Sequence, residues 1–129
     1  MKKKLFIILP VVFVLLCSVF LFTACVDADY GVQITKMNGL GYLEQQDAGT
    51  SNCTAEYVFT RNTVSGREVV YVLYFANEHH AVEHENHFLD KSLSMLKENN
   101  PDIAETYTYV RVGKIFLHGT EKGVADALS

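Results

Sequence analysis

The first 24 residues constrain the fold most, because we expect them to lie outside the water-soluble core and to leave the rest of the chain to form it. Three lysines, Lys2 to Lys4, precede an almost unbroken apolar run from Leu5 to Phe22. A basic start followed by an apolar stretch is typical of an export signal. The run also approaches the roughly 20 residues that span a bilayer, so an uncleaved anchor is the alternative. Lysines ahead of such a run stay in the cytoplasm, so both interpretations place the following residues on the outer side.

The end of the apolar run, Phe22-Thr23-Ala24-Cys25, resembles the lipobox of bacterial lipoproteins, where a small residue precedes the cysteine that becomes lipidated. Phe22 departs from the pattern, which usually has leucine at that position. The resemblance implies that residues 1–24 are a signal peptide and that Cys25 carries acyl chains such as palmitate. The protein would then be lipid-anchored at the cell membrane, facing the extracytoplasmic side. Cleavage at Val26-Asp27-Ala28 by the ordinary signal peptidase, giving a soluble secreted product, is a further alternative.

The part of the chain that follows the signal is acidic and has the length of one domain. We expect residues 25–31 to form a tether and residues 32–129 a single extracytoplasmic domain. From Cys25 onward there are 8 Lys and Arg against 15 Asp and Glu, a net charge of −7. This balance argues against nucleic-acid binding. With Cys17 in the signal and Cys25 lipidated, no second cysteine is left to form an intramolecular disulfide with Cys53. We expect Cys53 to be buried or inert; a catalytic nucleophile and an intermolecular thiol are the alternatives.

The middle of the chain predicts a hairpin followed by a helix. Residues 54–62 and 68–76 are rich in β-branched and aromatic side chains, and residues 63–67 join them as a loop. Asn77 is suited to cap a helix, and apolar residues then recur with helical spacing until Asn99-Asn100-Pro101 stops it near Glu98.

The C-terminal part predicts a second hairpin and a last short helix. Residues 106–112 and 115–118 read as strands, and Gly113 suits the first position of a type II′ turn. One bent strand through Gly113 is the alternative. Thr120 can cap a helix over residues 121–128, and residues 32–52 permit a short helix in front. The fold class is therefore α+β: a four-stranded antiparallel sheet of two hairpins in the order ββαββα, with helices packed on one face.

Histidines form the one cluster that could carry metal chemistry. On a helix, His80, His84 and His87 fall within about 60° of each other, and His79 and Glu83 flank them. Histidines four residues apart on a helix are a geometry that zinc sites use, so a zinc site on this face is a candidate. The alternatives are an ordinary solvated helix face and a cluster that gains charge as the pH falls through about 6.5.

Tyrosines on the predicted strands form a second candidate site. Tyr57, Tyr107, Tyr109 and Arg111 would lie on the sheet, and an uncovered face carrying them could receive an envelope protein or a glycan. Tyrosine is also common on half-covered sheets, which is the simpler explanation. No sequence context for a catalytic nucleophile is apparent. We therefore expect a non-catalytic binding or interaction module with no cofactor; the alternative is a metal-binding or metal-sensing lipoprotein.

Overall fold

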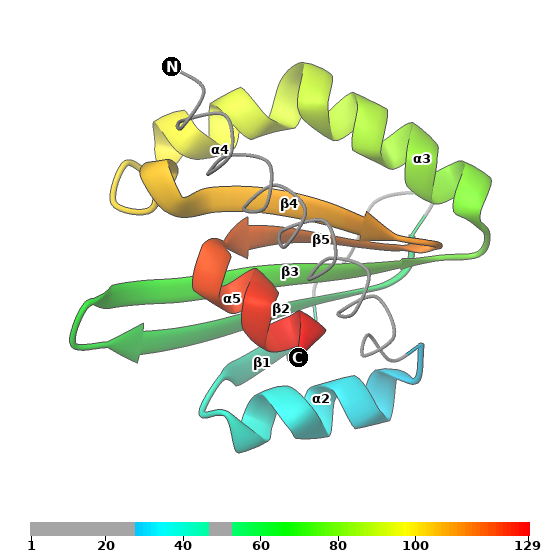
Figure 1. The fold of residues 1–129 in the computed structure, drawn as a ribbon. Helices are drawn as coiled ribbons and strands as arrows, with labels where there is room; N and C mark the ends of the chain where they lie inside the picture. The colour runs from blue at the N-terminus through cyan, green and yellow to red at the C-terminus, as the bar shows by residue number, and fades with distance from the viewer. Residues whose placement is uncertain (1–27, 47–52) are drawn as a thin grey trace, which may run out of the picture.

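The computed structural model describes residues 28–46 and 53–129, whose helices surround one antiparallel sheet (Figure 1). In chain order the elements are α2 (Tyr30–Gly39), β1 (Leu43–Gln46), β2 (Cys53–Thr63), β3 (Gly66–Phe75), α3 (Glu78–His87), a π-helical turn (Phe88–Ser92), α4 (Leu93–Asn99), a 3-10 turn (Ala104–Thr106), β4 (Tyr107–Val112), β5 (Ile115–Thr120) and α5 (Glu121–Leu128). The predicted α+β class is confirmed. The predicted signal peptide and residues 25–27 of the predicted tether, Cys25 included, lie outside the described residues.

The sheet has five strands in the order β1-β2-β3-β5-β4, and all neighbours are antiparallel. Both predicted hairpins, β2–β3 and β4–β5, are present, and β3 pairs with β5 to join them. In the β4–β5 turn Gly113 has a φ of 59°, and within the described part of the chain positive φ values occur only at glycines. A two-residue turn with positive φ at its first position alone fits type II′, as predicted, so the bent-strand alternative is wrong.

The prediction of four strands in the order ββαββα is wrong at its N-terminal end. Strand β1 pairs with β2 as an additional edge strand, and α2 precedes it. The helix begins at Tyr30, inside the predicted tether, because the Asp29 carboxylate accepts a hydrogen bond from the Gly31 amide at 2.9 Å. The sequence of β1, LEQQ, is short and polar, so it carries little strand signal of its own.

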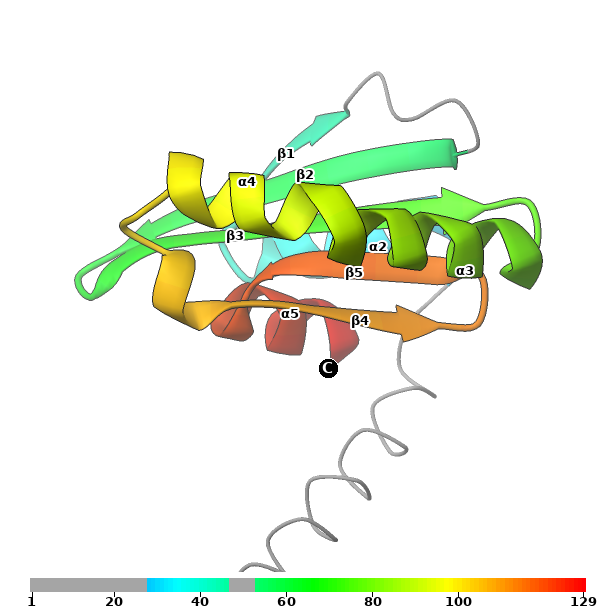
Figure 2. The same cartoon turned by 90° about the horizontal axis from the view of Figure 1, so that it is seen from above.

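The prediction that helices pack on one face of the sheet is also wrong, because both faces are covered. Helices α3 and α4 run over one face, and α2 and α5 lie on the other (Figures 1 and 2). The core is accordingly divided into two layers. The α3–α4 side is built on Leu73, Phe75, Phe88 and Phe116, and the α2–α5 side on Met37, Phe59, Val72 and Leu117. Alternate residues of β3 and β5 contribute to the two layers, as the pleat of a strand requires.

The long helical segment over the sheet begins where the sequence predicts. The Asn77 side chain accepts a hydrogen bond from the His80 amide at 2.9 Å, so the predicted cap is confirmed. The segment ends at Asn99, one residue beyond the predicted end. Between α3 and α4 the helix widens, and the Leu93 amide bonds the Phe88 carbonyl five residues back. Such π-helical turns are rare and are frequent at functional sites.

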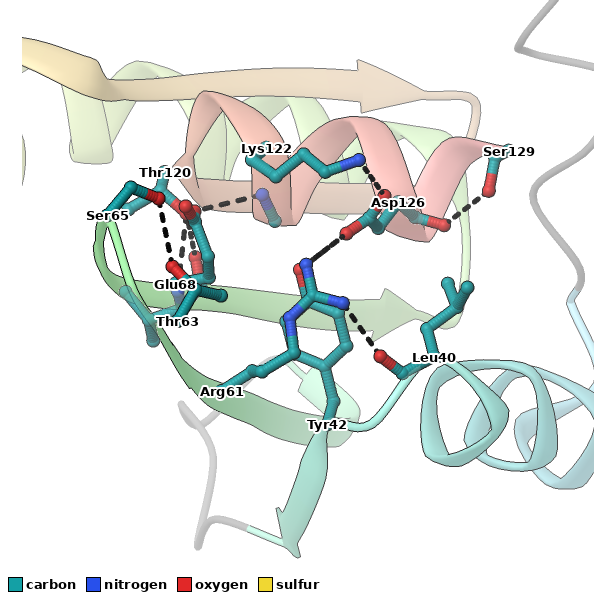
Figure 3. Close-up of polar contacts among 12 residues, drawn as sticks. Leu40, Tyr42, Arg61, Thr63, Ser65, Glu68, Thr120, Lys122, Asp126 and Ser129 are labelled. Carbon is teal, nitrogen blue, oxygen red and sulfur yellow. Dashed lines mark hydrogen bonds and ion pairs between the residues drawn. The ribbon is translucent and has the colours of Figure 1, made fainter.

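Helix α5 is held against the sheet by its own first turn. Thr120 caps the helix by accepting a hydrogen bond from the Gly123 amide, and its hydroxyl donates to Glu68 at 2.6 Å (Figure 3). A Cβ on Gly119 would lie 2.1 Å from the Val69 carbonyl oxygen, and one on Gly123 would lie 2.6 Å from the same atom. Glycine at these two positions therefore allows the strand and the helix to approach β3.

A polar network centred on Asp126 closes the α2–α5 side of the molecule (Figure 3). The Asp126 carboxylate accepts hydrogen bonds from Tyr42 at 2.6 Å, Arg61 at 3.1 Å and Lys122 at 2.9 Å. Burial by itself would raise the pKa of Asp126, but the hydrogen bonds from Tyr42 and Lys122 outweigh it and hold that pKa below its ordinary value. The Arg61 guanidinium also lies 4.4 Å from the centre of the Tyr42 ring, a cation–π contact. The network ties α5 to β2 and to the turn that leads into β1.

Candidate ligand-binding pocket

A pocket of about 300 Å³ lies between the helical layer of α3 and α4 and the sheet. Strands β2, β3 and β5 form its floor, and the helical segment from α3 through the π-helical turn to α4 forms its wall. The lining residues are Glu56, Tyr71, Leu73 and His118 from the strands, and His84, Phe88, Ser92, Met95, Leu96 and Asn99 from the helices. The site therefore combines an apolar body with a few polar groups, which is the usual composition of a small-molecule pocket.

The π-helical turn belongs to the pocket wall. Its first and last residues, Phe88 and Ser92, both line the cavity, and Phe88 is 1% exposed. Because of this turn, the helical residues that line the pocket continue from His84 on α3 to Leu96 and Asn99 on α4. The sequence predicts one regular helix here. No local sequence pattern indicates that the helix widens to five residues per hydrogen-bonded turn at Phe88–Ser92.

His118 is buried at the floor of the pocket and is held by aromatic neighbours. Its ring is stacked on Tyr71 with centroids 4.5 Å apart and an angle of 6° between the planes. Its Nδ1 atom lies 2.7 Å from the Tyr107 hydroxyl, within hydrogen-bonding distance. Burial, with a smaller contribution from His84, lowers the pKa of His118 to about 3. The imidazole is therefore neutral at physiological pH and offers one donor and one acceptor nitrogen.

His84 faces the sheet from α3. Its ring lies 5.2 Å from both Phe75 and Phe116, measured between ring centroids. Burial lowers the pKa of His84, and the neighbouring His87 lowers it further. Two uncharged imidazoles, from different layers of the fold, thus line one cavity.

Glu56 places a carboxylate in the same cavity. It lies on β2 opposite Leu73 of β3 and is 9% exposed. The sequence reasoning missed this residue. The signal that could have found it is the alternation along β2, which puts Glu56 on the same side of the strand as Val58, a core-facing position. Charged residues are seldom fully buried unless they are paired.

The predicted zinc site is not assembled. Within residues 28–46 and 53–129, no three His, Cys, Asp or Glu side chains lie together in a way that could hold a metal ion. His79 and Glu83 are exposed and pair with each other at 2.9 Å, and His87 is exposed. The inward stripe of α3 passes through Ala81, His84 and Phe88, so His84 faces the sheet, whereas His79 and His87 are exposed.

The predicted tyrosine surface is not an open face of the sheet. Tyr57 lies on the α2–α5 side, where Tyr30 and Tyr74 contact it, whereas Tyr107 and Tyr109 pack on the α3–α4 side. Tyr107 is only 7% exposed. Arg111 does share a side with Tyr109, but it forms ion pairs with Glu78 at 3.0 Å and Glu85 at 3.7 Å on α3. Tyr107 is therefore part of the core, and Tyr57 and Tyr109 are half-buried against it.

Cys53 is half-buried at the start of β2, and its thiol lies 2.8 Å from the Ala55 carbonyl oxygen and 3.4 Å from that of Tyr74. It is not among the described residues that line the pocket. The thiol therefore takes part in local hydrogen bonding at the start of β2.

No protein-family model, curated protein or solved structure matches this chain. A functional assignment therefore depends on the geometry of the pocket. Among the helices of residues 28–46 and 53–129, none is long and apolar enough to cross a membrane.

Proposed function

We propose that this protein is a membrane-anchored extracytoplasmic lipoprotein whose domain binds a small molecule without chemical turnover. The observation that carries the proposal is the pocket between the helical layer and the sheet, with His84, His118 and Glu56 among its lining residues. Small-molecule pockets combine an apolar lining with a few polar groups that orient the ligand, and these three side chains are the kind of group that does so.

The size and character of the pocket support a ligand of modest size. A volume of about 300 Å³ is at the lower end of the range for small-molecule sites. Leu73, Phe88 and Leu96 supply apolar contact area, whereas Ser92 and Asn99 supply hydrogen-bonding groups near the helical wall. The ligand would therefore have a compact apolar body with a few polar substituents.

The N-terminal sequence supports the location. A signal peptide over residues 1–24 and acylation of Cys25 would leave the domain attached to the outer side of the cell membrane. Such an anchor keeps a binding domain close to the membrane without a spanning helix. The membrane is then the partner of the lipidated N-terminus, and an envelope protein or glycan remains a candidate partner of the domain.

Binding can be tested with the full chain in detergent micelles. A fragment library would be screened by ligand-observed NMR against the wild type, the Ser92→Trp variant and the Ser94→Trp variant. Ser92 lines the pocket and Ser94 is an exposed residue two positions further along the helix, so only the first indole fills the cavity. We expect hits that Ser92→Trp removes and Ser94→Trp retains. Hits lost equally in both variants, or absent from the wild type, would contradict the proposal.

The anchor can be tested separately by mass spectrometry of the mature N-terminus. We expect a diacyl or triacyl mass on Cys25 that disappears in Cys25→Ser and persists in Cys17→Ser. An unmodified N-terminus at Asp29, or an intact residue 1, would contradict lipidation.

A further inference from the structure

His118 brings a buried imidazole with one unpaired nitrogen to the floor of the pocket. The residue is 6% exposed, and its Nδ1 atom lies 2.7 Å from the Tyr107 hydroxyl. Among the residues that the structure describes, the other ring nitrogen, Nε2, has no hydrogen-bond partner. Buried polar groups are nearly always hydrogen-bonded in native proteins. An unpaired nitrogen on a residue that lines a cavity therefore indicates a place where a ligand can supply the partner.

The contact between Tyr107 and His118 decides which ring nitrogen carries the proton. Burial lowers the pKa of His118 and raises the pKa of Tyr107, so both side chains are uncharged at neutral pH. If Nδ1 carried the proton, Tyr107 would have to accept this hydrogen bond. Its own O–H would then have no acceptor within the described residues, and a buried donor without a partner is costly. The favoured arrangement has Tyr107 donating to Nδ1 and the proton on Nε2, which makes Nε2 a donor.

The lining of the pocket disfavours an anion as the partner of this donor. No lysine or arginine occurs among the described residues that line the cavity. A carboxylate carried into the pocket would lose hydration with no cation to compensate for the loss, which is costly. The acceptor should therefore be an uncharged oxygen, as in a ketone, an ester or an amide.

Apolar side chains surround the same donor. The Phe88 ring lies 4.6 Å from the His118 ring, measured between centroids, and Leu73 and Leu96 line the cavity with them. In surroundings of low dielectric constant a hydrogen bond is electrostatically stronger than in water. These surroundings favour an acceptor oxygen that is attached to an apolar body.

We infer that the pocket binds a small, uncharged carbonyl compound whose oxygen accepts a hydrogen bond from Nε2 of His118 and whose apolar body contacts Phe88 and Leu96. Tyr107 is then a positioning residue, because it does not line the pocket but holds the proton on Nε2 through its bond to Nδ1. This inference rests on the proposed function, since it names the ligand class of the same pocket.

The position of the proton can be measured on the full chain in detergent micelles at neutral pH, without a ligand. Long-range proton–nitrogen correlation spectra distinguish a protonated ring nitrogen from an unprotonated one. We expect the proton of wild-type His118 on Nε2, and a mixture of both tautomers in Tyr107→Phe. Tyr109→Phe is the matched control, because Tyr109 lies on the same strand, outside the pocket, and has no hydrogen bond to His118. It should retain the wild-type spectrum.

Two spectroscopic results would count against the inference. A proton on Nδ1 in the wild type would overturn it, because the pocket would then offer an acceptor instead of a donor. A wild-type spectrum retained by Tyr107→Phe would overturn the positioning role of Tyr107.

Three matched probes test the ligand class on the same sample. Acetophenone carries a carbonyl oxygen, α-methylstyrene has a methylene group in its place and no acceptor, and benzoate is an anionic acceptor of similar size. Dissociation constants would come from titrations that follow the side-chain resonances of His84 and His118, with free probe concentrations fixed by equilibrium dialysis. We expect acetophenone to bind about threefold to tenfold more tightly than α-methylstyrene, which corresponds to one neutral hydrogen bond. Benzoate should bind more weakly than acetophenone.

Two phenylalanine variants locate the donor. His118→Phe keeps a ring but removes the N–H, so it should lower the affinity for acetophenone to that for α-methylstyrene, followed by the resonances of His84. His79→Phe makes the same change at an exposed histidine outside the pocket and should retain the preference. The tautomer measurement needs no variant of His118, so it tests the inference even if His118→Phe does not fold.

The possible results separate the ligand class from the binding function. Equal or tighter binding of α-methylstyrene, tighter binding of benzoate, or a preference that survives His118→Phe would overturn the carbonyl inference alone. Failure of acetophenone to bind would do the same if other fragments still bind and are lost in Ser92→Trp. Absence of every fragment that is sensitive to Ser92→Trp would overturn the inference together with the proposed function.

Discussion

The buried polar groups on the two faces of the sheet have different surroundings. On the α2–α5 face the Asp126 carboxylate is surrounded by Tyr42, Arg61 and Lys122, so charges neutralise one another inside the protein (Figure 3). On the α3–α4 face Glu56 and two neutral histidines surround a cavity of about 300 Å³. The first arrangement closes a face of the sheet, whereas the second places polar side chains in the lining of a cavity.

This difference leads us to expect that the α2–α5 face contributes most to stability, whereas the proposed binding pocket lies on the α3–α4 face. A carboxylate with several internal partners contributes to folding, and removing one partner is costly. Polar groups around a cavity contribute less to folding and more to selectivity for what enters. Substitutions on the two faces should therefore separate stability from binding.

The largest effect is expected on the sealed face, at Gly119. In Gly119→Ala the new Cβ would meet the Val69 carbonyl oxygen at 2.1 Å, and the backbone of two paired strands cannot move away independently. We expect the free energy of unfolding to fall by more than about 3 kcal/mol, measured by urea unfolding followed by circular dichroism. Gly39→Ala is the control, because no atom lies within 4 Å of its Cβ and alanine favours a helix, so stability should be unchanged or raised by about 1 kcal/mol. A Gly119→Ala protein as stable as the wild type would contradict the packing of β5 on β3.

On the pocket face, the next largest effect is expected from acid. Burial lowers the pKa of His118 to about 3, so the folded protein does not take up the proton that the unfolded imidazole binds below about 6.5. Its stabilising contribution is complete above that pH and is lost as the pH falls towards 3. Between pH 7 and pH 4.5 we expect the wild type to lose roughly 3 kcal/mol through this residue.

The matched variants for acid sensitivity are His118→Gln and His79→Gln. His79 is exposed on α3, so its replacement should preserve the pH dependence of urea unfolding, whereas His118→Gln should flatten it. Identical pH dependence in both variants would show that His118 is accessible to protons in the folded state.

A smaller effect is expected from removing the charge at the centre of the sealed face. Asp126→Asn leaves Arg61 and Lys122 without their carboxylate and should cost about 2 kcal/mol in the free energy of unfolding. Because the pKa of Asp126 lies below its ordinary value, the wild-type contribution should be present above that value and lost as the pH falls below it. Asp102→Asn breaks an exposed ion pair with Arg67 and should cost less than about 1 kcal/mol. Equal costs in the two variants, measured by urea unfolding, would show that Asp126 is no more important than a surface charge.

The smallest effect on stability is expected at the pocket wall. In His84→Leu an apolar side chain replaces a neutral imidazole that lies between Phe75 and Phe116, so stability should be unchanged or raised by up to about 1 kcal/mol. His87→Leu places the same side chain on an exposed position of the same helix and should give no gain. Thermal unfolding of both variants checks this. A clear loss of stability in His84→Leu would mean that the imidazole serves the fold rather than the pocket.

Much of the fold could be predicted because its signals are local. Asn77 and Thr120 cap helices through contacts within three residues, and Gly113 permits its turn through its own backbone conformation. The remainder depends on contacts between distant segments. Strand β1 has a polar sequence and exists because β2 offers it an edge. The glycine in α5 that weakens it as a helix is required for close packing on Val69, which a helix propensity does not include.

The candidate site shows the same division. Helical spacing correctly placed histidines on α3. It did not predict which of them faces the sheet, because that is decided by the packing of Ala81 and Phe88. His84 instead meets His118 and Glu56 in one cavity, and these residues are far apart in the sequence.

By itself, therefore, the sequence determined the α+β class, both hairpins, the capped helices and the acidic charge, since each follows from local chemistry or composition. Only the tertiary structure decided the join of β3 to β5, the helices on both faces and the pocket. Those features arise when segments distant in the chain bury their surfaces together, and the resulting pairing is a property of the packed layers rather than of any one segment.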